Sequence, residues 1–261
     1  MQKIGIIGCG NLGLSLLNGI RKREPQTVLY GSKRNIGSLK KLEDNVTFFT
    51  SDNKQVIQEC DIIILALKPF TIIPFLTENA AYFDERRHTI VSVATGITTK
   101  EMEQCLNKSI DMYRAMPNTA SSVNESITMI SNNSDVLNRK DKIIEIFNCL
   151  GETIMIEEAL MESATVLGAC GIAYVLRFMR AMIQGGIEIG FDANTATKIV
   201  SQTVKGAAEL IIRNGSHPEQ EIDKVTTPKG CTIVGLNEME HSGFSSALIK
   251  GIVTSYEKIA K

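Results

Sequence analysis

A glycine-rich turn near the start of the chain has the spacing of a dinucleotide-binding loop. Residues Gly8–Gly13 read G-C-G-N-L-G, follow an aliphatic run that ends at Ile7, and precede a segment of helical periodicity, Leu14–Arg23. Such glycines permit a tight bend and let a pyrophosphate approach the amino end of the helix, where free N–H groups and the helix dipole favour anions. The turn therefore predicts a dinucleotide site. The alternative is a glycine turn without a ligand. The predicted contacts are Ile7, Gly8, Cys9, Gly10, Asn11, Leu12 and Gly13.

The residues that follow the second aliphatic run indicate which dinucleotide is bound. A site that prefers NAD normally has Asp or Glu about 20 residues after the turn, where it holds the ribose 2′-hydroxyl. The chain instead has Ser32, Lys33 and Arg34. One hydroxyl and two cations suit a 2′-phosphate, which accepts charge-assisted hydrogen bonds. We therefore predict NADPH, with NADH possible; the alternative is that both cations are simply solvated.

Other loops combine polar groups with glycine or proline. Ala66–Pro69 and Val93–Gly96 follow buried-type aliphatic runs, at the place where open α/β sheets bind ligands, although either could be a plain strand-to-helix turn. Arg114–Thr119 reads as a proline-stiffened bend with polar groups. Lys224–Thr232 is a Thr/Gly-rich turn before an apolar, helix-like run, so it could offer several N–H donors to a carboxylate or act only as a helix cap.

Histidine and cysteine usage excludes several other chemistries. Three histidines leave few ways to build a Ser/His/Asp hydrolase or a multi-histidine metal site. Of six cysteines the closest two, Cys149 and Cys170, are 21 positions apart, so neither a zinc knuckle nor a redox pair is encoded. We predict no metal and reduced thiols.

Composition and charge limit the class of partner. The chain has 261 residues, with 28 Lys+Arg against 29 Asp+Glu. This balance gives no excess of positive charge with which to bind nucleic acid. The first residues run into a strand-like segment without a signal region, and no stretch is expected to approach the ~18 apolar residues of a membrane span. A cytoplasmic protein without a membrane partner is predicted.

The elements that position these loops follow from hydrophobic patterning. Short β-rich runs alternate with longer mixed segments up to residue 157, which predicts an α/β fold with a parallel sheet and a dinucleotide-binding domain over 1–157. Long helical patterns then fill a second domain, 158–261. The predicted strands are Lys3–Gly8, Thr27–Tyr30, Val46–Thr50, Asp61–Leu67, Thr89–Ala94, Ile127–Ser131 and Thr153–Ile156. The predicted long helices are Met161–Gly190, Ala193–Asn214 and Phe244–Lys261.

The helical domain carries many small residues on its expected faces. Small side chains let helices approach closely, and about 100 residues of helix alone make a thin core. A homodimer or higher homo-oligomer through this domain is the preferred interpretation; the alternative is that the helices pack on the first domain. The small residues are Ala164, Gly168, Ala169, Gly171, Ala173, Ala181, Gly185 and Gly186.

With these motifs in place, the chain resembles the pyrroline-5-carboxylate reductase family from end to end. The resemblance rests on six segments: Ile7–Gly13, Leu65–Pro69, Arg114–Thr119, Glu158–Met161, Gln202–Ala208 and Val225–Leu236. It implies a Rossmann-type NAD(P)-binding domain, a helical dimerisation domain, and reduction of 1-pyrroline-5-carboxylate to L-proline. It also implies an active site between the Rossmann domain of one protomer and the helical domain of another.

The resemblance assigns roles by position. It implies that the cofactor is lined by Ser32, Asn53, Ala66, Leu67, Lys68, Pro69, Val93, Ala94 and Thr95. It implies that Gly230, Cys231 and Thr232 hold the substrate carboxylate and the imine nitrogen, beside Lys229. Hydride would be transferred to C5 of a protonated imine, so the enzyme would mainly need to position the reactants and would not need an acid-base pair of side chains. Thr232 would hydrogen-bond the ring nitrogen.

The chain departs from the family at two places near the expected substrate. Gly168–Tyr174 reads G-A-C-G-I-A-Y where the family usually reads S-G-S-G-P-A-Y, and Pro228–Gly230 reads P-K-G where it reads P-G-G. Retained activity is favoured because the cofactor loops and Thr232 are intact. The alternatives are a regulatory or altered-substrate paralogue that binds NADP, and a related imine or β-hydroxyacid oxidoreductase. The latter needs an early lysine in its helical domain, and none occurs between Glu158 and Ile189.

Overall fold

The computed structural model describes residues 2–259, which form two compact units. The sheet unit comprises the residues up to Cys170 together with Ile259, and the helical unit is Gly171–Lys258. The predicted domain boundary after residue 157 stays a prediction. Each unit is described by itself below.

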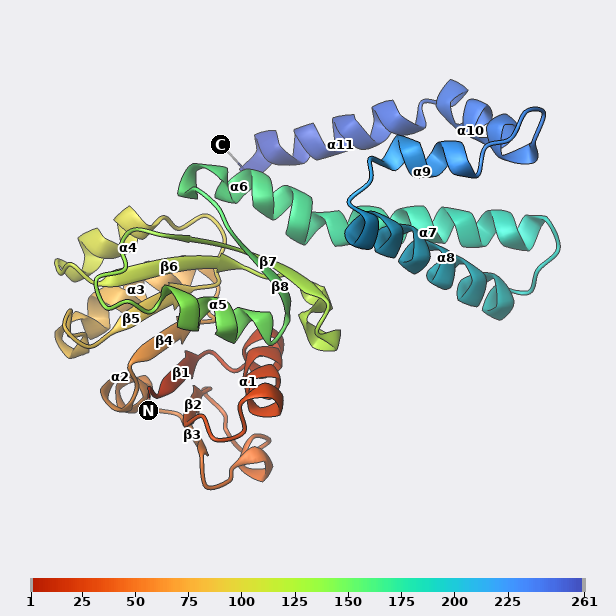
Figure 1. Ribbon diagram of the computed structural model, residues 1–261. Helices are drawn as coiled ribbons and strands as arrows, with labels where there is room; N and C mark the ends of the chain where they lie inside the picture. Colours follow the sequence, from red (N-terminus) through yellow and green to blue (C-terminus); the bar gives the residue numbers. More distant parts are fainter. Residues whose placement is uncertain (1, 260–261) are drawn as a thin grey trace. The chain divides into compact units, whose positions relative to one another are not determined.

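The sheet unit holds eight strands in the order β3-β2-β1-β4-β5-β6-β7-β8 (Figure 1). All neighbours are parallel except β6 and β7, so the sheet is mostly parallel, as the alternating pattern predicted. The strands are β1 (Ile4–Ile7), β2 (Leu29–Ser32), β3 (Thr47–Thr50), β4 (Ile62–Leu65), β5 (Thr89–Ser92), β6 (Asp111–Met116), β7 (Ser126–Asn132) and β8 (Gly151–Met155). The main helices are α1 (Asn11–Arg23), α2 (Asn53–Glu59), α3 (Pro69–Asn79), α4 (Thr99–Leu106), α5 (Lys140–Asn148) and α6 (Met161–Ala164). Shorter turns are η1 (Lys40–Leu42), η2 (Ala80–Tyr82), η3 (Thr119–Val123), η4 (Glu158–Leu160) and the π-helical η5 (Thr165–Cys170).

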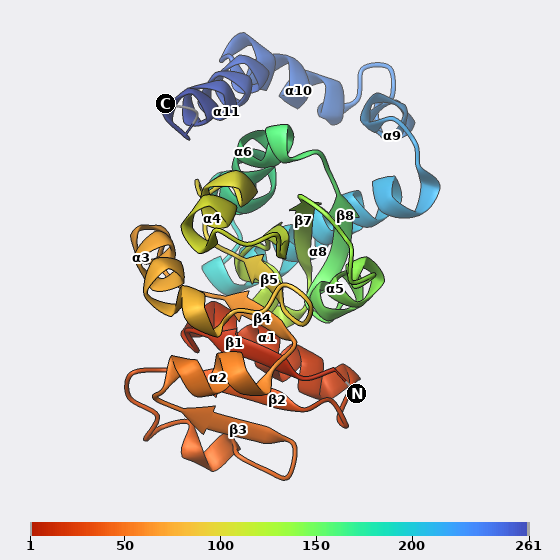
Figure 2. The ribbon, with the colours of Figure 1, turned by 90° about the vertical axis from the view of Figure 1, so that its left-hand side faces the viewer.

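Helices cover both faces of the sheet, as Figure 2 shows. Successive strand residues point to opposite faces, so Ile4 and Ile6 pack with α1 and α5, whereas Ile7 packs with α2, α3 and α4. Both faces of β1 and β4 are therefore buried, which explains their continuous aliphatic sequences.

Strand β6 was not predicted, because its sequence contains two charged residues that are buried. Asp111 accepts hydrogen bonds from the Ser134 hydroxyl at 2.6 Å and from the backbone N–H of Leu137 at 2.8 Å. Arg114 is only 1% exposed and pairs with carboxylates that lie far along the chain. A strand can bury charges only where such partners exist, and local sequence does not reveal them.

Strand β2 lies two residues later than predicted, over Leu29–Ser32. Gly31 is tolerated inside this strand because the Cys9 sulfur and the Phe49 ring both occupy the space of a side chain; a Cβ there would lie 2.7 Å from either. The shift makes Ser32 the last strand residue, directly at the predicted site.

The helical unit consists of α7 (Gly171–Glu188), α8 (Ala193–Asn214), α9 (Pro218–Lys224), α10 (Cys231–His241) and α11 (Phe244–Ile259). Asp192 caps α8 by accepting from the N–H groups of Asn194 and Thr195, and Gly215 ends this helix at φ +61°. Helix α9 was not predicted. The predicted end of the last helix, at Lys261, lies outside the described residues.

One helical stretch corrects the expectation that no segment approaches a membrane span. Residues 158–188 are, by length and composition, long and apolar enough to cross a membrane, and few of these residues are buried within the single chain. An exposed apolar helix needs a covering surface, and composition alone does not identify that surface.

Candidate active site

The predicted cofactor residues gather at one edge of the sheet. Parallel strands β1, β2, β3, β4 and β5 end at this edge, and the proposed cofactor residues are the last residues of these strands or lie directly after them. The turn Gly8–Gly13 follows β1, Lys33 and Arg34 follow β2, and Asn53 opens α2. Ala66–Pro69 follow β4, and Val93–Thr95 follow β5. Ligands of open α/β sheets bind at this edge.

Two glycines of the turn are crowded by neighbouring backbone atoms, and a third faces open space. Gly8 has φ +101°, and a Cβ there would lie 2.4 Å from the Ala66 carbonyl oxygen; a Cβ on Gly13 would lie 2.5 Å from the Gly8 oxygen. Both positions therefore require glycine. A Cβ on Gly10, in contrast, meets nothing within 4 Å. Gly10 is the N-cap of α1 and supplies no side chain to the first turn, so open space and free N–H groups coincide there.

The 2′-phosphate position proposed from the sequence has matching side chains. The Ser32 hydroxyl donates to the Asn53 side-chain oxygen at 2.6 Å, which joins the end of β2 to the start of α2. Lys33 and Arg34 are exposed beside them, and within residues 2–259 neither cation forms an ion pair. These cations are available to an anionic ligand.

Cys9 lies inside the turn but its thiol is not a reactive group. The side chain is fully buried and packs against Gly31 of β2. Burial raises the pKa of this thiol to about 12, so it stays protonated at neutral pH. Cys9 therefore supports the turn and could reach a ligand only through its backbone.

Arg114 and Asn118 serve structure, although the sequence grouped them with candidate polar sites. Arg114 donates to Glu162 at 2.9 Å and to Glu158 at 3.3 Å, and Glu158 also accepts from the N–H and the hydroxyl of Thr99. The Asn118 amide caps η3 and donates to the Gly168 oxygen at 3.1 Å. The two glutamates were missed because their roles depend on pairing across the fold.

The proposed substrate residues form the start of α10 in the helical unit. Gly230 is the N-cap, its N–H donates to the Thr227 oxygen at 2.9 Å, and a Cβ there would lie 2.6 Å from the Thr227 hydroxyl. Cys231 and Thr232 are the first two helical residues, so their N–H groups are free for an anion. Lys229 adopts φ +61°, a conformation that favours glycine.

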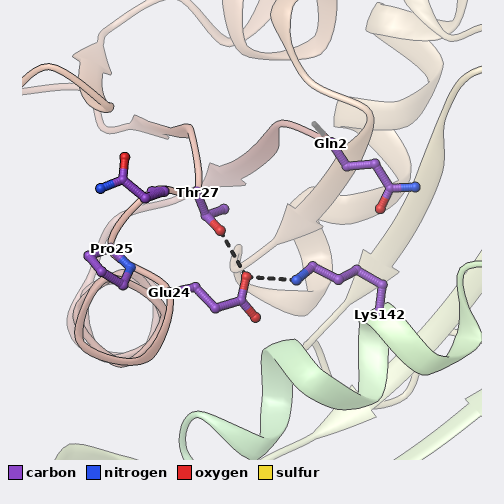
Figure 3. A pocket seen from close by; sticks show the side chains of 6 residues that line it. Gln2, Glu24, Pro25, Thr27 and Lys142 are labelled. Atoms are coloured by element: carbon purple, nitrogen blue, oxygen red, sulfur yellow. Dashed lines mark hydrogen bonds and ion pairs between the residues drawn. The ribbon is translucent and has the colours of Figure 1, made fainter.

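A cavity near the opposite edge of the sheet is lined by charged side chains that pair with each other. It has a volume of about 500 Å³ and is lined by Glu24, Thr27 and Lys142, among others (Figure 3). Glu24 accepts from Lys142 at 2.6 Å and from the Thr27 hydroxyl at 2.8 Å. Its polar groups satisfy one another, so this cavity is not the candidate site.

Two family models match separate parts of the chain. Residues 158–261 match the family model described as pyrroline-5-carboxylate reductase dimerisation, and residues 3–96 match the one described as NADP oxidoreductase, coenzyme F420-dependent.

Two relatives from Dictyostelium discoideum, pyrroline-5-carboxylate reductases 1 and 2, are each 42% identical to this chain and cover 98% and 100% of it. The chain spans 49% of the length of the first and 93% of the second. Among solved structures, a pyrroline-5-carboxylate reductase from Coxiella burnetii has a TM-score of 0.92 at 27% identity, covering 99% of this chain and 97% of its own. One from Plasmodium falciparum, with NADP bound, has a TM-score of 0.85 at 26% identity, covering 98% and 96%. The chain belongs to the pyrroline-5-carboxylate reductase family.

Proposed function

We propose that this protein reduces 1-pyrroline-5-carboxylate to L-proline with NADPH. The observation that carries the proposal is the geometry of the turn Gly8–Gly13, in a chain that belongs to the pyrroline-5-carboxylate reductase family. Its two crowded glycines fix the loop, and Gly10 leaves open the space that a pyrophosphate would fill. Location in the cytoplasm stays a prediction.

The sheet unit would hold the cofactor through the residues gathered at its carboxyl edge. Backbone N–H groups at the start of α1 would bind the pyrophosphate, and Ser32, Lys33 and Arg34 would bind the 2′-phosphate. The exposed cations and the missing carboxylate support NADPH over NADH. When bound, the reduced nicotinamide supplies the hydride.

The helical unit would hold the substrate. The free N–H groups of Cys231 and Thr232 suit a carboxylate at the start of α10, and the Thr232 hydroxyl is half-buried there. A hydrogen bond from this hydroxyl to the ring nitrogen would orient the imine. A protonated imine is already electrophilic, so orientation and exclusion of water carry most of the remaining work.

The two departures from the family pattern have different structural meanings. At Gly168, where the family usually has a serine, a Cβ would lie 2.5 Å from the terminal methyl group of Met129 on β7, so a larger residue would require only this flexible side chain to move. Lys229 replaces a glycine and keeps the left-handed backbone at φ +61°. A lysine in this conformation costs about 1 kcal/mol, and its exposed cation stands next to the proposed carboxylate site.

We infer that the helical unit pairs with a second copy of the chain. Many large apolar side chains of this unit are exposed, including Leu176 at 58% and Ile249 at 62%. A cavity of about 510 Å³ between α7 and α11 is lined mainly by apolar groups such as Phe178 and Leu248. A second copy would cover these surfaces and residues 158–188. Sedimentation equilibrium tests the pairing: a mass near twice 28.6 kDa is expected, and a monomer at micromolar concentration would contradict it.

The test of the substrate site is Thr232→Val, which keeps the shape of the side chain and deletes its hydroxyl. A hydrogen bond that forms fully only as the imine is reduced contributes to the rate, so we expect kcat to fall about ten- to a hundred-fold with little change in KM. Lys229→Ala provides the contrast. A charge that only attracts the carboxylate should raise KM and reduce its salt dependence, while kcat stays nearly constant.

Both variants are measured in the same assay of NADPH oxidation. Unchanged turnover in Thr232→Val would show that its hydroxyl does not contact the imine. Absence of turnover in the parent protein would instead favour the regulatory paralogue.

A further inference from the structure

The loop between β5 and α4, residues 93–98, is fixed to the sheet at its first residues. The Val93 N–H donates to the Leu65 carbonyl of β4 at 3.2 Å, and the Ala94 N–H donates to the Ser92 hydroxyl at 3.3 Å. Val93 and Ala94 are both buried. The start of the loop, which carries the proposed cofactor residues, is therefore held by β4 and β5.

The middle of the loop has little support of its own. Thr95 and Gly96 are exposed. Gly96 has φ +74°, and a Cβ there would meet nothing within 4 Å. Because neighbouring atoms do not fix this part, its conformation depends on how firmly the two ends of the loop are held.

The far end of the loop is held by a carboxylate from a distant segment. Thr99, the first residue of α4, is only 3% exposed. Its N–H donates to one oxygen of Glu158 at 2.8 Å, and its hydroxyl donates to the other at 2.5 Å. Glu158 lies 59 positions later, at the start of η4. Hydrogen bonds to an ionised acceptor are stronger than those between neutral groups.

Helix α4 already has a cap formed by its own residues. The Thr98 hydroxyl accepts from the Glu101 N–H at 3.1 Å, and the Glu101 carboxylate accepts from the Thr98 N–H at 2.7 Å. The bonds from Thr99 to Glu158 come in addition to this cap, and they tie the start of the helix to a segment far along the chain.

A buried cation connects the two ends of the loop. Arg114 lies on β6 directly beside Ser92, the last residue of β5, and its side chain is 2% exposed. Its guanidinium donates to Glu158 at 3.3 Å and to Glu162 at 2.9 Å. The sheet that holds the start of the loop therefore also orients the carboxylate that holds its end.

We propose that Glu158 is a positioning residue for the cofactor: through Thr99 it keeps loop 93–98 in the conformation that binds NADPH. The inference rests on the proposed function, because it requires the cofactor to contact residues 93–95. Without this bond the loop would occupy other conformations as well. The apparent Kd of a ligand rises as the fraction of binding-competent protein falls.

The test is calorimetric titration of the full-length protein with NADPH and with 2′,5′-ADP. The smaller ligand would occupy residues 32–34 at the end of β2, which β1 and β4 separate from β5. Thr99→Val deletes the hydroxyl and should weaken NADPH about three- to ten-fold, while the Kd of 2′,5′-ADP stays unchanged. Thr99→Ser keeps the hydroxyl and should bind NADPH as the parent does.

Thr27→Val is the matched control at the opposite edge of the sheet. Thr27 is 8% exposed, and its hydroxyl donates at 2.8 Å to Glu24, a carboxylate that also accepts from the cation of Lys142. The control thus removes the same kind of bond from the same kind of cluster. It should lower the Tm, as Thr99→Val does, and change neither Kd.

Glu158→Gln gives a second, independent variant. It keeps the shape of the side chain and removes the charge that strengthens both bonds from Thr99, so NADPH should again bind more weakly than 2′,5′-ADP does relative to the parent. Arg114 keeps its bond to Glu162 in this variant. If Thr99→Val does not fold, this variant decides the question.

Four results would overturn the inference while the proposed function stands. They are an unchanged Kd of NADPH in the folded variants, equal weakening of both ligands, a loss in Thr27→Val as large as in Thr99→Val, and a Thr99→Ser variant as weak as Thr99→Val. A parent protein that binds neither ligand would contradict the proposed function itself, and the inference with it.

Discussion

The two edges of the sheet unit differ in whether their charged side chains are paired within the fold. At the amino edge, charged side chains are paired within the fold: Arg87 bonds Asp61 at 3.0 Å, and Arg139 donates to the Asp61 and Arg87 carbonyls at 2.8 and 2.6 Å. At the carboxyl edge, Lys33 and Arg34 stay exposed, and the glycine turn leaves N–H groups free.

This difference indicates that the polar groups of the amino edge stabilise the fold, whereas those of the carboxyl edge are available for binding. Both edges have a cavity of about 500 Å³. What marks the carboxyl edge is that Lys33 and Arg34 form no ion pair within residues 2–259 and that N–H groups of the glycine turn are free. Substitutions at the amino edge should therefore change the free energy of unfolding, and those at the carboxyl edge should change cofactor affinity.

The largest expected effect is on the glycine turn, where two alanine variants separate the causes. Gly10→Ala adds a methyl group to open space that a pyrophosphate needs, so we expect NADPH affinity to fall about a thousand-fold, or about 4 kcal/mol, with an unchanged Tm. Gly8→Ala forces an unfavourable φ and a contact with the Ala66 oxygen, so it should also lower stability by about 1–3 kcal/mol. Wild-type affinity in Gly10→Ala would rule out the pyrophosphate site.

At the amino edge, Arg139→Met removes a cation that is only 9% exposed, together with its hydrogen bonds to the Asp61 and Arg87 carbonyls; the Asp61 carbonyl keeps the bond from the Thr89 N–H. We expect a loss of about 2–4 kcal/mol in the free energy of unfolding, measured with urea, and no change in NADPH affinity at low temperature. A large change in the NADPH affinity of the folded variant would contradict the claim that the amino edge does not contribute to binding.

Arg34→Ala tests the cation pair at the carboxyl edge. Loss of a charge-assisted hydrogen bond to the 2′-phosphate should weaken NADPH by about ten- to a hundred-fold and leave NADH nearly unchanged. Steady-state constants with both cofactors decide it. Better use of NADH than NADPH by the parent would show that Ser32, Lys33 and Arg34 do not bind a 2′-phosphate.

The smallest effect concerns pH and His88, which precedes β5 at the amino edge. Burial, with a contribution from Arg87, lowers the pKa of this imidazole, and its Nδ1 accepts from the Asp84 N–H at 2.8 Å. The unfolded chain therefore takes up the proton first, and stability should decline as pH falls below ~6.5. Urea unfolding of the parent and of His88→Gln at pH 7.5 and 5.5 should show a smaller decline in the variant; an equal decline would exclude His88 as its source.

Sequence reasoning located the features that depend on local signals. The glycine turn, seven of the eight strands and the N-cap Asp192 each follow from a short pattern of residues. Strand β6 was missed because the partners of Arg114 lie 44 and 48 positions away. The roles of the site residues stay predictions until ligand binding is measured.

The most direct measurement is the reduction of 1-pyrroline-5-carboxylate by the purified full-length protein, followed by NADPH oxidation and by detection of L-proline. We predict equal amounts of NADPH consumed and proline formed, with faster turnover for NADPH than for NADH. NADPH binding without any proline formed, under conditions in which the protein is folded, would contradict the proposed reaction.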